Sequence, residues 1–410
     1  MSAPIVVEPG LDAARERGVL RDWRAGALAV VAGYSTFDPG TALRFGAVIC
    51  LGVLLSEAGR IRPRAADVLA VALTLWAAMS LTWAVNPSAT ALAVGNQVAV
   101  LAIFVATRTT IRTPTQLAIV AFGFVGGCVV ALAKLVNQNQ GASFNVELSV
   151  ARYGIAGVNL NYTAYSLTTG LAIIVLLWQV RGPLHRARPL LLVLVPLFYF
   201  GLAQNGSRGA FLGAVLVLAW LVTWRLFPFV GVTVPVLLLC VGVFMTLTGW
   251  GDNTLRLLDA GSLRTTENLA GRLAVWPYAR ESISENPFVG IGAGGFSTIN
   301  PFGIGAHNVP LEVAAGLGLI GLCLLAASAF SALLAETRTV EPLTRRLLVG
   351  TLIAASGPIL LSGHWEVAPA GWFALALFSR IGVLPPPPPR RRRGLRRPGA
   401  LGRARGRRPG

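Results

Sequence analysis

The sequence predicts an all-α protein: a polytopic transmembrane helical bundle of about twelve spans, with one large extracytoplasmic loop that contains short helices. Hydrophobic residues make up 54% of the 410 residues and charged residues only 13%, about half the charged share of ordinary soluble domains. The mean hydropathy is +0.65. Because the apolar residues come in long runs, these observations exclude both a soluble globular domain and a disordered chain.

Each predicted span is an apolar run close to the roughly 20 residues that a helix needs to cross a bilayer. The first two runs are short and are separated by Asp38-Pro39-Gly40, so a re-entrant hairpin is an alternative for this pair. The predicted spans are residues 25–37, 41–56, 65–84, 88–107, 115–135, 159–180, 189–204, 208–226, 229–249, 309–334, 345–363 and 367–384.

The arginines predict which side of the membrane each connection faces. With the N-terminus in the cytoplasm, the inner segments carry most of them, as the positive-inside rule requires. The short outer loops carry almost none, and the large loop of about residues 250–308 is long enough to escape the rule. The predicted inner arginines are Arg15, Arg17, Arg21, Arg24, Arg60, Arg62, Arg64, Arg108, Arg112, Arg181, Arg186, Arg188, Arg225, Arg338, Arg345 and Arg346.

The chain divides into three parts. Residues 1–24 are polar and form a cytoplasmic segment without a cleavable signal peptide, residues 25–384 form the transmembrane domain, and residues 385–410 form a Pro/Arg-rich cytoplasmic tail. The net charge is +18, and residues 390–410 contain ten arginines and no acidic residue. Because this tail has no aromatic residue for stacking on bases, we predict a disordered anchor on anionic lipid and no nucleic-acid partner.

The four cysteines each lie inside an apolar run. They have neither CxxC spacing nor a neighbouring histidine, so we predict buried, unpaired thiols and no metal site. The residues are Cys50, Cys128, Cys240 and Cys323.

The large outer loop is predicted to contain a helix over residues 268–285 that lies across the outer face. Arg272, Trp276 and Arg280 are spaced i, i+4, i+8 and therefore share one side of it. Pro277 should kink this helix or split it in two, and Asn286-Pro287 should end it.

A glycine-rich stretch, Gly290–Gly295, follows this helix and formally matches G-x-G-x-x-G. No βαβ unit surrounds it, so a dinucleotide site is rejected. The glycines are predicted to let the backbone approach a ligand or a neighbouring helix closely.

His307 lies at the predicted membrane boundary, just before a long apolar helix. A helix N-terminus disfavours a protonated imidazole, and a neutral imidazole is what a general base requires. An ordinary interfacial histidine is the alternative. His364 is the other outward-facing histidine, and its neighbours Trp365 and Glu366 are typical of an interfacial belt.

Several motifs over about residues 155–325 resemble the O-antigen ligase/polymerase superfamily. One departure is Gly316, nine positions after His307, where many family members carry an acidic residue; Glu312 lies one turn earlier. The motifs are Gly157 with Asn161 and Ala164, the stretch from Asn205 to Ala210, Gly271-Arg272 with Trp276, Asn286-Pro287 with Gly290, Gly292, Gly294 and Phe296, His307-Asn308 with Leu311, and Gly318 with Gly321.

The resemblance implies a metal-independent glycosyltransferase without a cofactor, at the outer face of the bacterial inner membrane. It would move a glycan from an undecaprenyl-diphosphate carrier to a sugar hydroxyl on a lipid or glycan acceptor. His307 would be the catalytic base. Arginine pairs with phosphate bidentately, so Arg208 and Arg272 would bind the diphosphate. Further substrate-binding candidates are Arg264, Arg280, Asn308, Asn161 and Trp276.

Each assignment has a structural alternative. Arg208 would otherwise snorkel to the interface, Arg264 and Arg280 would be solvated loop charges, Trp276 would pack, and Asn161 would cap a helix. A repeat-unit polymerase uses the same residue types as a ligase. The ligase is preferred because only one large loop carries arginines. A polysaccharide transporter is the third reading, but it predicts internal repeats and a polar path at mid-membrane, which the sequence does not show.

Overall fold

The computed structural model describes residues 22–137, 154–180, 188–225, 233–249, 272–361 and 366–384. Within these ranges the chain is helical and has no strand, which confirms the predicted all-α class. Residues 1–21, the loop segment 250–271 and the tail 385–410 lie outside the described residues. The predictions made for those three segments therefore stay predictions.

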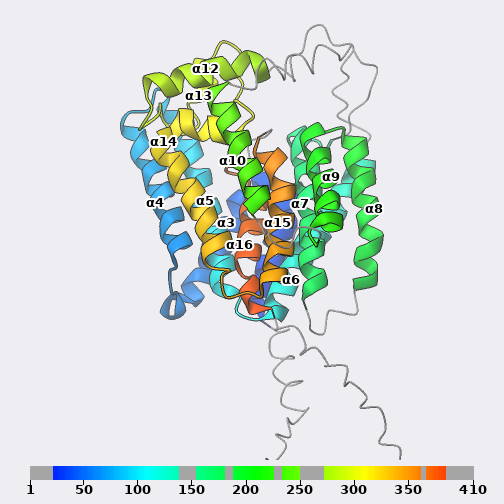
Figure 1. The fold of residues 1–410 in the computed structure, drawn as a ribbon. Coiled ribbons are helices and arrows are strands. Elements are labelled where there is room, and N and C mark those ends of the chain that lie inside the picture. Colours follow the sequence, from blue (N-terminus) through cyan, green and yellow to red (C-terminus); the bar gives the residue numbers. More distant parts are fainter. Residues whose placement is uncertain are drawn as a thin grey trace, which may run out of the picture.

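The long helices pack side by side as a bundle, and α12 lies across one end of it (Figure 1). Short 3₁₀ or π turns occur at Ala58–Arg60, Ser80–Thr82, Ser331–Ala335 and Ile381–Val383. The helices are α2 (Trp23–Phe37), α3 (Pro39–Ser56), α4 (Ala65–Met79), α5 (Pro87–Thr110), α6 (Pro114–Asn137), α7 (Leu160–Gln179), α8 (Arg188–Asn205), α9 (Arg208–Thr223), α10 (Thr233–Thr248), α12 (Arg272–Glu285), α13 (Phe296–Ile299), α14 (Val309–Phe330), α15 (Pro342–Leu360) and α16 (Pro369–Ser379).

Every predicted span contains one of these helices, from α2 to α10 and from α14 to α16. Among the described residues, eight helices are long and apolar enough to cross a membrane, and three apolar helices are shorter, in α9, α10 and α16. The protein is therefore a multi-pass membrane protein. The number of twelve spans stays a prediction.

The first helix, α2, runs alongside α6 for most of its length. At one end the Gln116 amide donates to the Asp22 carboxylate at 2.8 Å. At the other end Lys134 Nζ lies 4.5 Å from the centroid of the Phe37 ring. Between these contacts a Cβ on Gly123 would collide with the backbone of α2, so small residues allow the two helices to touch closely. This long contact favours a spanning α2 over the re-entrant hairpin.

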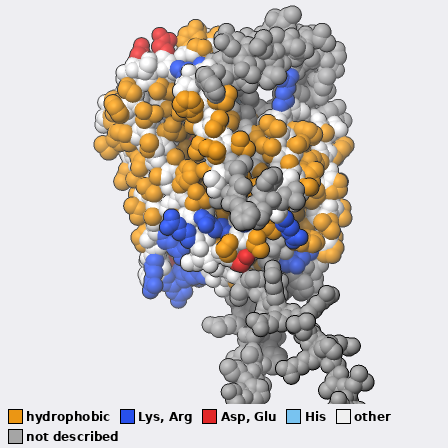
Figure 2. All heavy atoms as spheres, viewed as in Figure 1, with side chains coloured by type: hydrophobic (Ala, Val, Ile, Leu, Met, Phe, Trp, Pro, Cys, Tyr) orange, Lys and Arg blue, Asp and Glu red, His pale blue; other side chains and the backbone are white. Residues whose placement is uncertain are grey.

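The two ends of the bundle differ in charge. Figure 2 shows a broad apolar band with Lys and Arg side chains gathered at its lower edge. At that end Arg24 and Arg112 pair with Glu57 at 3.3 and 2.7 Å, and Arg64 pairs with Glu336 at 3.5 Å. α12 lies at the opposite end (Figure 1). Most of the described arginines therefore follow the asymmetry that the positive-inside rule predicts.

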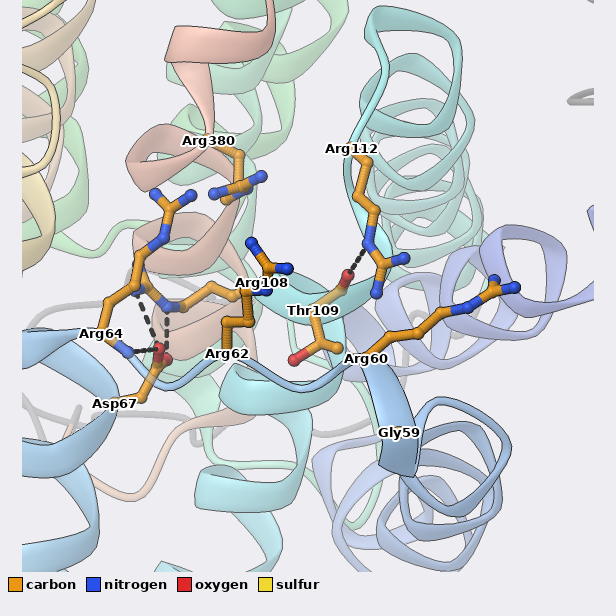
Figure 3. Close-up of a pocket in the computed structure, with 9 residues that line it drawn as sticks. All are labelled: Gly59, Arg60, Arg62, Arg64, Asp67, Arg108, Thr109, Arg112 and Arg380. Carbon is orange, nitrogen blue, oxygen red and sulfur yellow. Dashed lines mark hydrogen bonds and ion pairs between the residues drawn. The ribbon is translucent and has the colours of Figure 1, made fainter.

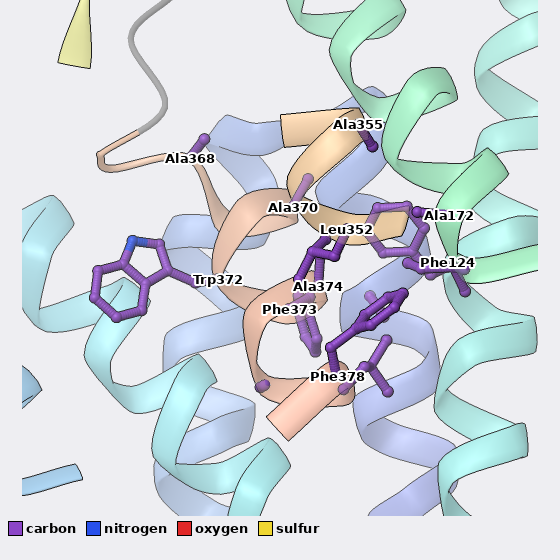
Figure 4. Close-up of a cluster of buried hydrophobic side chains, with 14 of the residues drawn as sticks. Phe124, Ala172, Leu352, Ala355, Ala368, Ala370, Trp372, Phe373, Ala374 and Phe378 are labelled. Carbon is purple, nitrogen blue, oxygen red and sulfur yellow. The ribbon is translucent and has the colours of Figure 1, made fainter. Parts of the chain in front are cut away.

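The short helix α16 is surrounded by other helices of the bundle (Figure 4). Its 11 residues extend roughly 17 Å, well short of the hydrocarbon core of about 30 Å. Phe373 and Phe378 are fully buried, and Trp372 packs edge-on against Phe104 with ring centroids 5.2 Å apart. Because neighbouring helices surround α16, its length does not need to match the thickness of the bilayer.

α12 attaches to the bundle through an apolar face. Val275, Trp276 and Ala279 are buried and form a small apolar cluster with Phe296 and Leu311, among other residues. Their spacing puts them on one side of the helix. α12 therefore lies across the end of the bundle with a defined side facing inward, as predicted for the outer loop helix.

Pro277 lies inside α12 and does not split it in two, so of the two predicted outcomes the division is wrong and the kink stays a prediction. A proline inside a helix removes one backbone donor and strains the preceding turn. Burial of Val275, Trp276 and Ala279 in the apolar cluster offsets that cost. The helix ends at Glu285, directly before Asn286-Pro287, as predicted.

The prediction that all four cysteines are buried was half wrong. Cys50 and Cys128 are buried, whereas Cys240 and Cys323 are exposed on the surface of the bundle. An apolar run shows that a segment avoids water, but it does not show whether a given side faces protein or lipid. All four thiols are free.

We expect Gly127→Leu to destabilise the bundle, because a Cβ at this position would collide with the backbone of α2 at Gly33. Overpacking of this kind costs on the order of 1–3 kcal/mol, so the thermal unfolding midpoint in detergent should fall. Gly126→Leu is the matched control, since Gly126 is exposed and nothing lies within 4 Å of its Cβ position. Equal midpoints for the two variants would contradict the α2–α6 contact.

Candidate active site

His307 lies directly before α14, whose N-cap is Asn308. The Asn308 side chain accepts the Leu311 N–H at 3.1 Å, and Pro310 lies in the first turn, where no intrahelical donor is needed. This confirms the predicted place of His307 at a helix N-terminus. Among the described residues other than glycine, only His307 has a positive φ, at 50°. Such a conformation is costly for a residue with a Cβ.

Two side chains hold the backbone just before His307. The Trp276 indole N–H donates to the carbonyl oxygen of Ala306 at 2.9 Å, and the Glu312 carboxylate accepts the N–H of the same residue at 2.7 Å. Trp276 is buried and His307 half-buried. We call residues 306–308 the histidine turn. It is held from α12 on one side and from α14 on the other, and these contacts maintain the unusual backbone conformation of His307.

Arg280 connects α12 to the end of α10. Its Nε–H donates to the Thr246 carbonyl oxygen at 2.9 Å, close to the last turn of α10, where a cation is favourable. Its guanidinium carbon lies 5.9 Å from the centroid of the Trp276 ring. Arg280 and Trp276 therefore share a side of α12, as their spacing predicted. Both make contacts within the protein that position the histidine turn.

Arg208 is the first residue of α9 and is exposed. The Thr168 hydroxyl of α7 donates to the Ala210 carbonyl oxygen at 2.8 Å. Because Thr168 lies two turns inside α7, α9 begins roughly one and a half turns deeper in the bundle than Asn161. Asn161 itself lies in the first turn of α7, where the Asn159 side chain caps the helix.

Contacts along α15 place Arg208 and His307 at the same end of the bundle. α9 packs antiparallel to α15, and a Cβ on Gly213 would lie 2.7 Å from the Ala355 carbonyl oxygen. The C-cap of α15 is Leu361, whose carbonyl oxygen accepts a long hydrogen bond, 3.4 Å, from the Asn308 amide. Arg208 and the histidine turn therefore both lie near the C-terminal end of α15.

The structure does not describe the side chains of two of the predicted arginines, Arg272 and Arg264. Arg272 is the first residue of α12, and Arg264 lies outside the described residues, as does His364. The convergence of Arg208, Arg272 and His307 on one diphosphate site therefore stays a prediction.

The glycine-rich stretch packs against a break in α14. Gly318 has a φ of 69° in the middle of α14, which interrupts the helix. A Cβ on Gly290 would lie 2.5 Å from the backbone of Gly316, so this backbone approaches another as the sequence predicted. Three carbonyl oxygens near the break accept hydrogen bonds from outside α14. The Ile291 N–H donates to Ala315 at 3.0 Å, and the Gly292 N–H donates to Gly316 at 2.9 Å. The Trp76 indole N–H donates to Leu317 at 2.8 Å.

A cavity of about 380 Å³ lies beside this loop, between α4, α5 and the first half of α14. Its polar lining includes Asn96, Gln97, Ser297, Glu312 and Glu366. The Gln97 side chain is buried, and its amide nitrogen has no hydrogen-bond partner among the described residues. This cavity was not predicted from the sequence, although the consecutive pair Asn96-Gln97 inside a predicted span was a usable signal.

One comparison with known proteins gives a match over the segment that contains this site. Residues 191–326 match the family model described as O-antigen ligase, which confirms the resemblance to the O-antigen ligase/polymerase superfamily. The matched segment runs from α8 into α14 and so contains Arg208, α12, the glycine-rich stretch and His307. A comparison with curated proteins found no match.

We expect Trp276→Phe to loosen the histidine turn, because it keeps an aromatic ring but removes the N–H that the Ala306 carbonyl accepts. Losing this buried bond should cost about 1–2 kcal/mol, so amide hydrogen exchange in residues 304–309 should be about 5–30-fold faster. Trp83→Phe, which removes a longer bond to the Val289 carbonyl, should leave that segment unchanged. Equal exchange in both variants would refute the role of Trp276.

Proposed function

We propose that the protein is an O-antigen ligase-like membrane glycosyltransferase. It moves a glycan from an undecaprenyl-diphosphate carrier to a sugar hydroxyl on a lipid or glycan acceptor. The observation that carries this proposal is the family match over residues 191–326, because the same segment builds the fixed turn of His307. The match by itself supports the broader class of ligase- or polymerase-type membrane enzymes.

His307 acts as the general base in this proposal. It removes the proton from the acceptor hydroxyl, whose oxygen forms a bond to the anomeric carbon of the donor sugar. The bond from that carbon to the carrier diphosphate breaks, and undecaprenyl diphosphate leaves. One displacement of this kind inverts the configuration at the donor sugar. The helix N-terminus beside His307 favours the neutral imidazole that the step needs.

Arg208 and Arg272 neutralise the diphosphate as it leaves, with Arg264 as a further candidate. A guanidinium group stays charged and binds phosphate oxygens in pairs, so an arginine clamp stabilises the developing charge without a metal ion. The exposure of Arg208 at a recessed helix start supports access from the membrane side. Arg280 supports the site through α10 and Trp276.

The cavity beside the glycine-rich stretch suits a sugar in this proposal. Its amide and carboxylate groups, on Asn96, Gln97 and Glu312, are the groups that bind sugar hydroxyls through hydrogen bonds. Glu312 also accepts the N–H of Ala306, which connects the cavity to the histidine turn. Asn308 and Asn161 supply further polar groups at the same end.

The active site faces the periplasm of the bacterial inner membrane in this proposal. The arginine-rich end of the bundle takes the cytoplasmic side by the positive-inside rule, so α12 and His307 face outward, where the lipid-linked glycan is presented. Ligation is preferred over polymerisation because one large loop carries the arginines. The two reactions differ in what is joined: a ligase moves a finished glycan onto an acceptor, whereas a polymerase joins repeat units to one another.

We expect His307→Ala to lower glycan transfer by about 10²–10⁴-fold, the contribution of a positioned general base. The assay uses purified protein, a lipid-diphosphate-linked glycan donor and a chelator. Size-exclusion profiles check that the variant is folded. Undiminished transfer by the variant would refute the base, and loss of transfer by the unsubstituted protein in the chelator would refute metal independence.

We expect Arg208→Lys to weaken use of the donor by about tenfold or more, because lysine keeps the charge but loses the paired N–H donors of the guanidinium. Arg225→Lys is the matched control, since Arg225 lies beyond the other end of the same helix. Initial transfer rates at varied donor concentration provide the measurement. If both variants behave like the unsubstituted protein, Arg208 does not bind the diphosphate.

A further inference from the structure

A second cavity lies at the end of the bundle opposite α12. Its volume is about 410 Å³, and six arginines line it (Figure 3). They come from three separate segments: the connection between α3 and α4, the end of α5 and the residue that follows α16. We call this cavity the basic pocket, and its arginines are Arg60, Arg62, Arg64, Arg108, Arg112 and Arg380.

One arginine of the basic pocket, Arg108, connects several segments of the bundle through hydrogen bonds. Arg108 is buried, and its Nε and Nη2 donate to the Asp67 carboxylate at 2.6 and 3.2 Å. Nη2 also donates to Glu336 at 2.8 Å, and Nη1 to the Ser379 hydroxyl at 2.7 Å. Asp67 is the only acidic residue in the lining. Asp67 and Glu336 together carry two negative charges, against the six positive charges of the arginines that line the pocket.

The other arginines of the pocket have long ion pairs, partners outside the pocket lining, or no ion pair with a described carboxylate. Arg64 reaches Glu336 at 3.5 Å, with its side chain 49% exposed. Arg112 pairs with Glu57, which Arg24 shares. Arg60 and Arg62 are exposed, and neither makes an ion pair with a described carboxylate. The pocket therefore keeps an excess of positive charge.

Arg380 shows that this excess has a cost. It is half-buried, and its Nε–H donates to the Ile111 carbonyl oxygen at 2.9 Å. Arg64 and Arg108 line the same cavity, so two other cations repel this half-buried one. The positive-inside rule explains arginines at this end of the bundle. It does not explain why three segments converge on one cavity, or why a half-buried cation faces two others. An anion in the pocket would relieve the repulsion.

The surroundings of the basic pocket match the surface of a bilayer. The connection that carries three of its arginines joins the ends of two helices with exposed apolar side chains, Leu55 on α3 and Val68 on α4. A lipid whose phosphate entered the pocket would lay its acyl chains along these residues. Basic pockets between transmembrane helices on the cytoplasmic side bind acidic head groups in this way.

We propose that the basic pocket binds a phosphate group, supplied by an anionic phospholipid at the membrane surface opposite His307. Arg62, Arg64 and Arg380 contact the phosphate oxygens, while Arg108 holds the pocket together. The site is distinct from the proposed diphosphate site at the other end of the bundle. Its test does not depend on glycan transfer.

The test measures lipid retention by the purified full-length protein. Native mass spectrometry counts bound phosphatidylglycerol after exchange into detergent, with phosphatidylcholine as the zwitterionic control. We expect one phosphatidylglycerol to be retained in preference to phosphatidylcholine, and retention to be about tenfold weaker in Arg380→Gln and Arg62→Gln. Arg225→Gln is the control, because this arginine is exposed and lies outside the pocket.

Sodium pyrophosphate, tested as a stabiliser in thermal unfolding, distinguishes a soluble phosphate from a lipid. Stabilisation by pyrophosphate through the same arginines, without lipid retention, would overturn the lipid assignment. Equal loss of retention in Arg225→Gln would reduce the effect to general surface charge and overturn the pocket. The pocket would also be overturned if phosphatidylglycerol is not retained and pyrophosphate does not stabilise the protein. If Arg380→Gln does not fold, the exposed Arg62 carries the comparison.

Discussion

The interruption of α14 is the constraint on which the site-bearing end of this protein depends. A break in a helix inside an apolar bundle leaves backbone carbonyls without their usual donors, and each such group is costly when it is buried without a partner. The glycine-rich stretch and Trp76 supply the missing donors. Because only glycines allow this approach, the outer loop is held against α14 at a fixed position, and the first half of α14 is held with it.

The histidine turn follows from that arrangement. Once the first half of α14 is fixed, its N-terminus presents His307, and α12 covers it through Trp276. Glu312 adds the second contact to the same backbone residue. A strained backbone conformation persists only where its surroundings determine it, so these contacts support a functional role for His307. Trp276 and Arg280 serve the proposed site through position, since both make their described contacts within the protein.

Charge gives the two ends of the bundle different tasks. At the end opposite α12, the Asp67, Arg108 and Glu336 network joins α4 and α5 to the turn that follows α14. Six arginines and only one carboxylate, that of Asp67, line the cavity at this end, so it keeps a net positive charge. At the α12 end, the polar groups that line the cavity are mainly amides and carboxylates. An anionic head group and a neutral sugar would therefore be sorted to opposite ends of one bundle.

The helical class, the place of nearly every helix and the location of His307 at a helix start could all be predicted from the sequence. Apolar runs and capping residues are local signals, and a bilayer leaves a chain few alternatives to helices. Which sides of these helices face protein depends on how they pack together. The tertiary structure exposes Cys240 and Cys323, keeps α12 whole through Pro277 and gathers six arginines into one pocket. Those outcomes depend on contacts between segments far apart in the chain, such as Asn308 with Leu361, and spacing along one helix does not encode them.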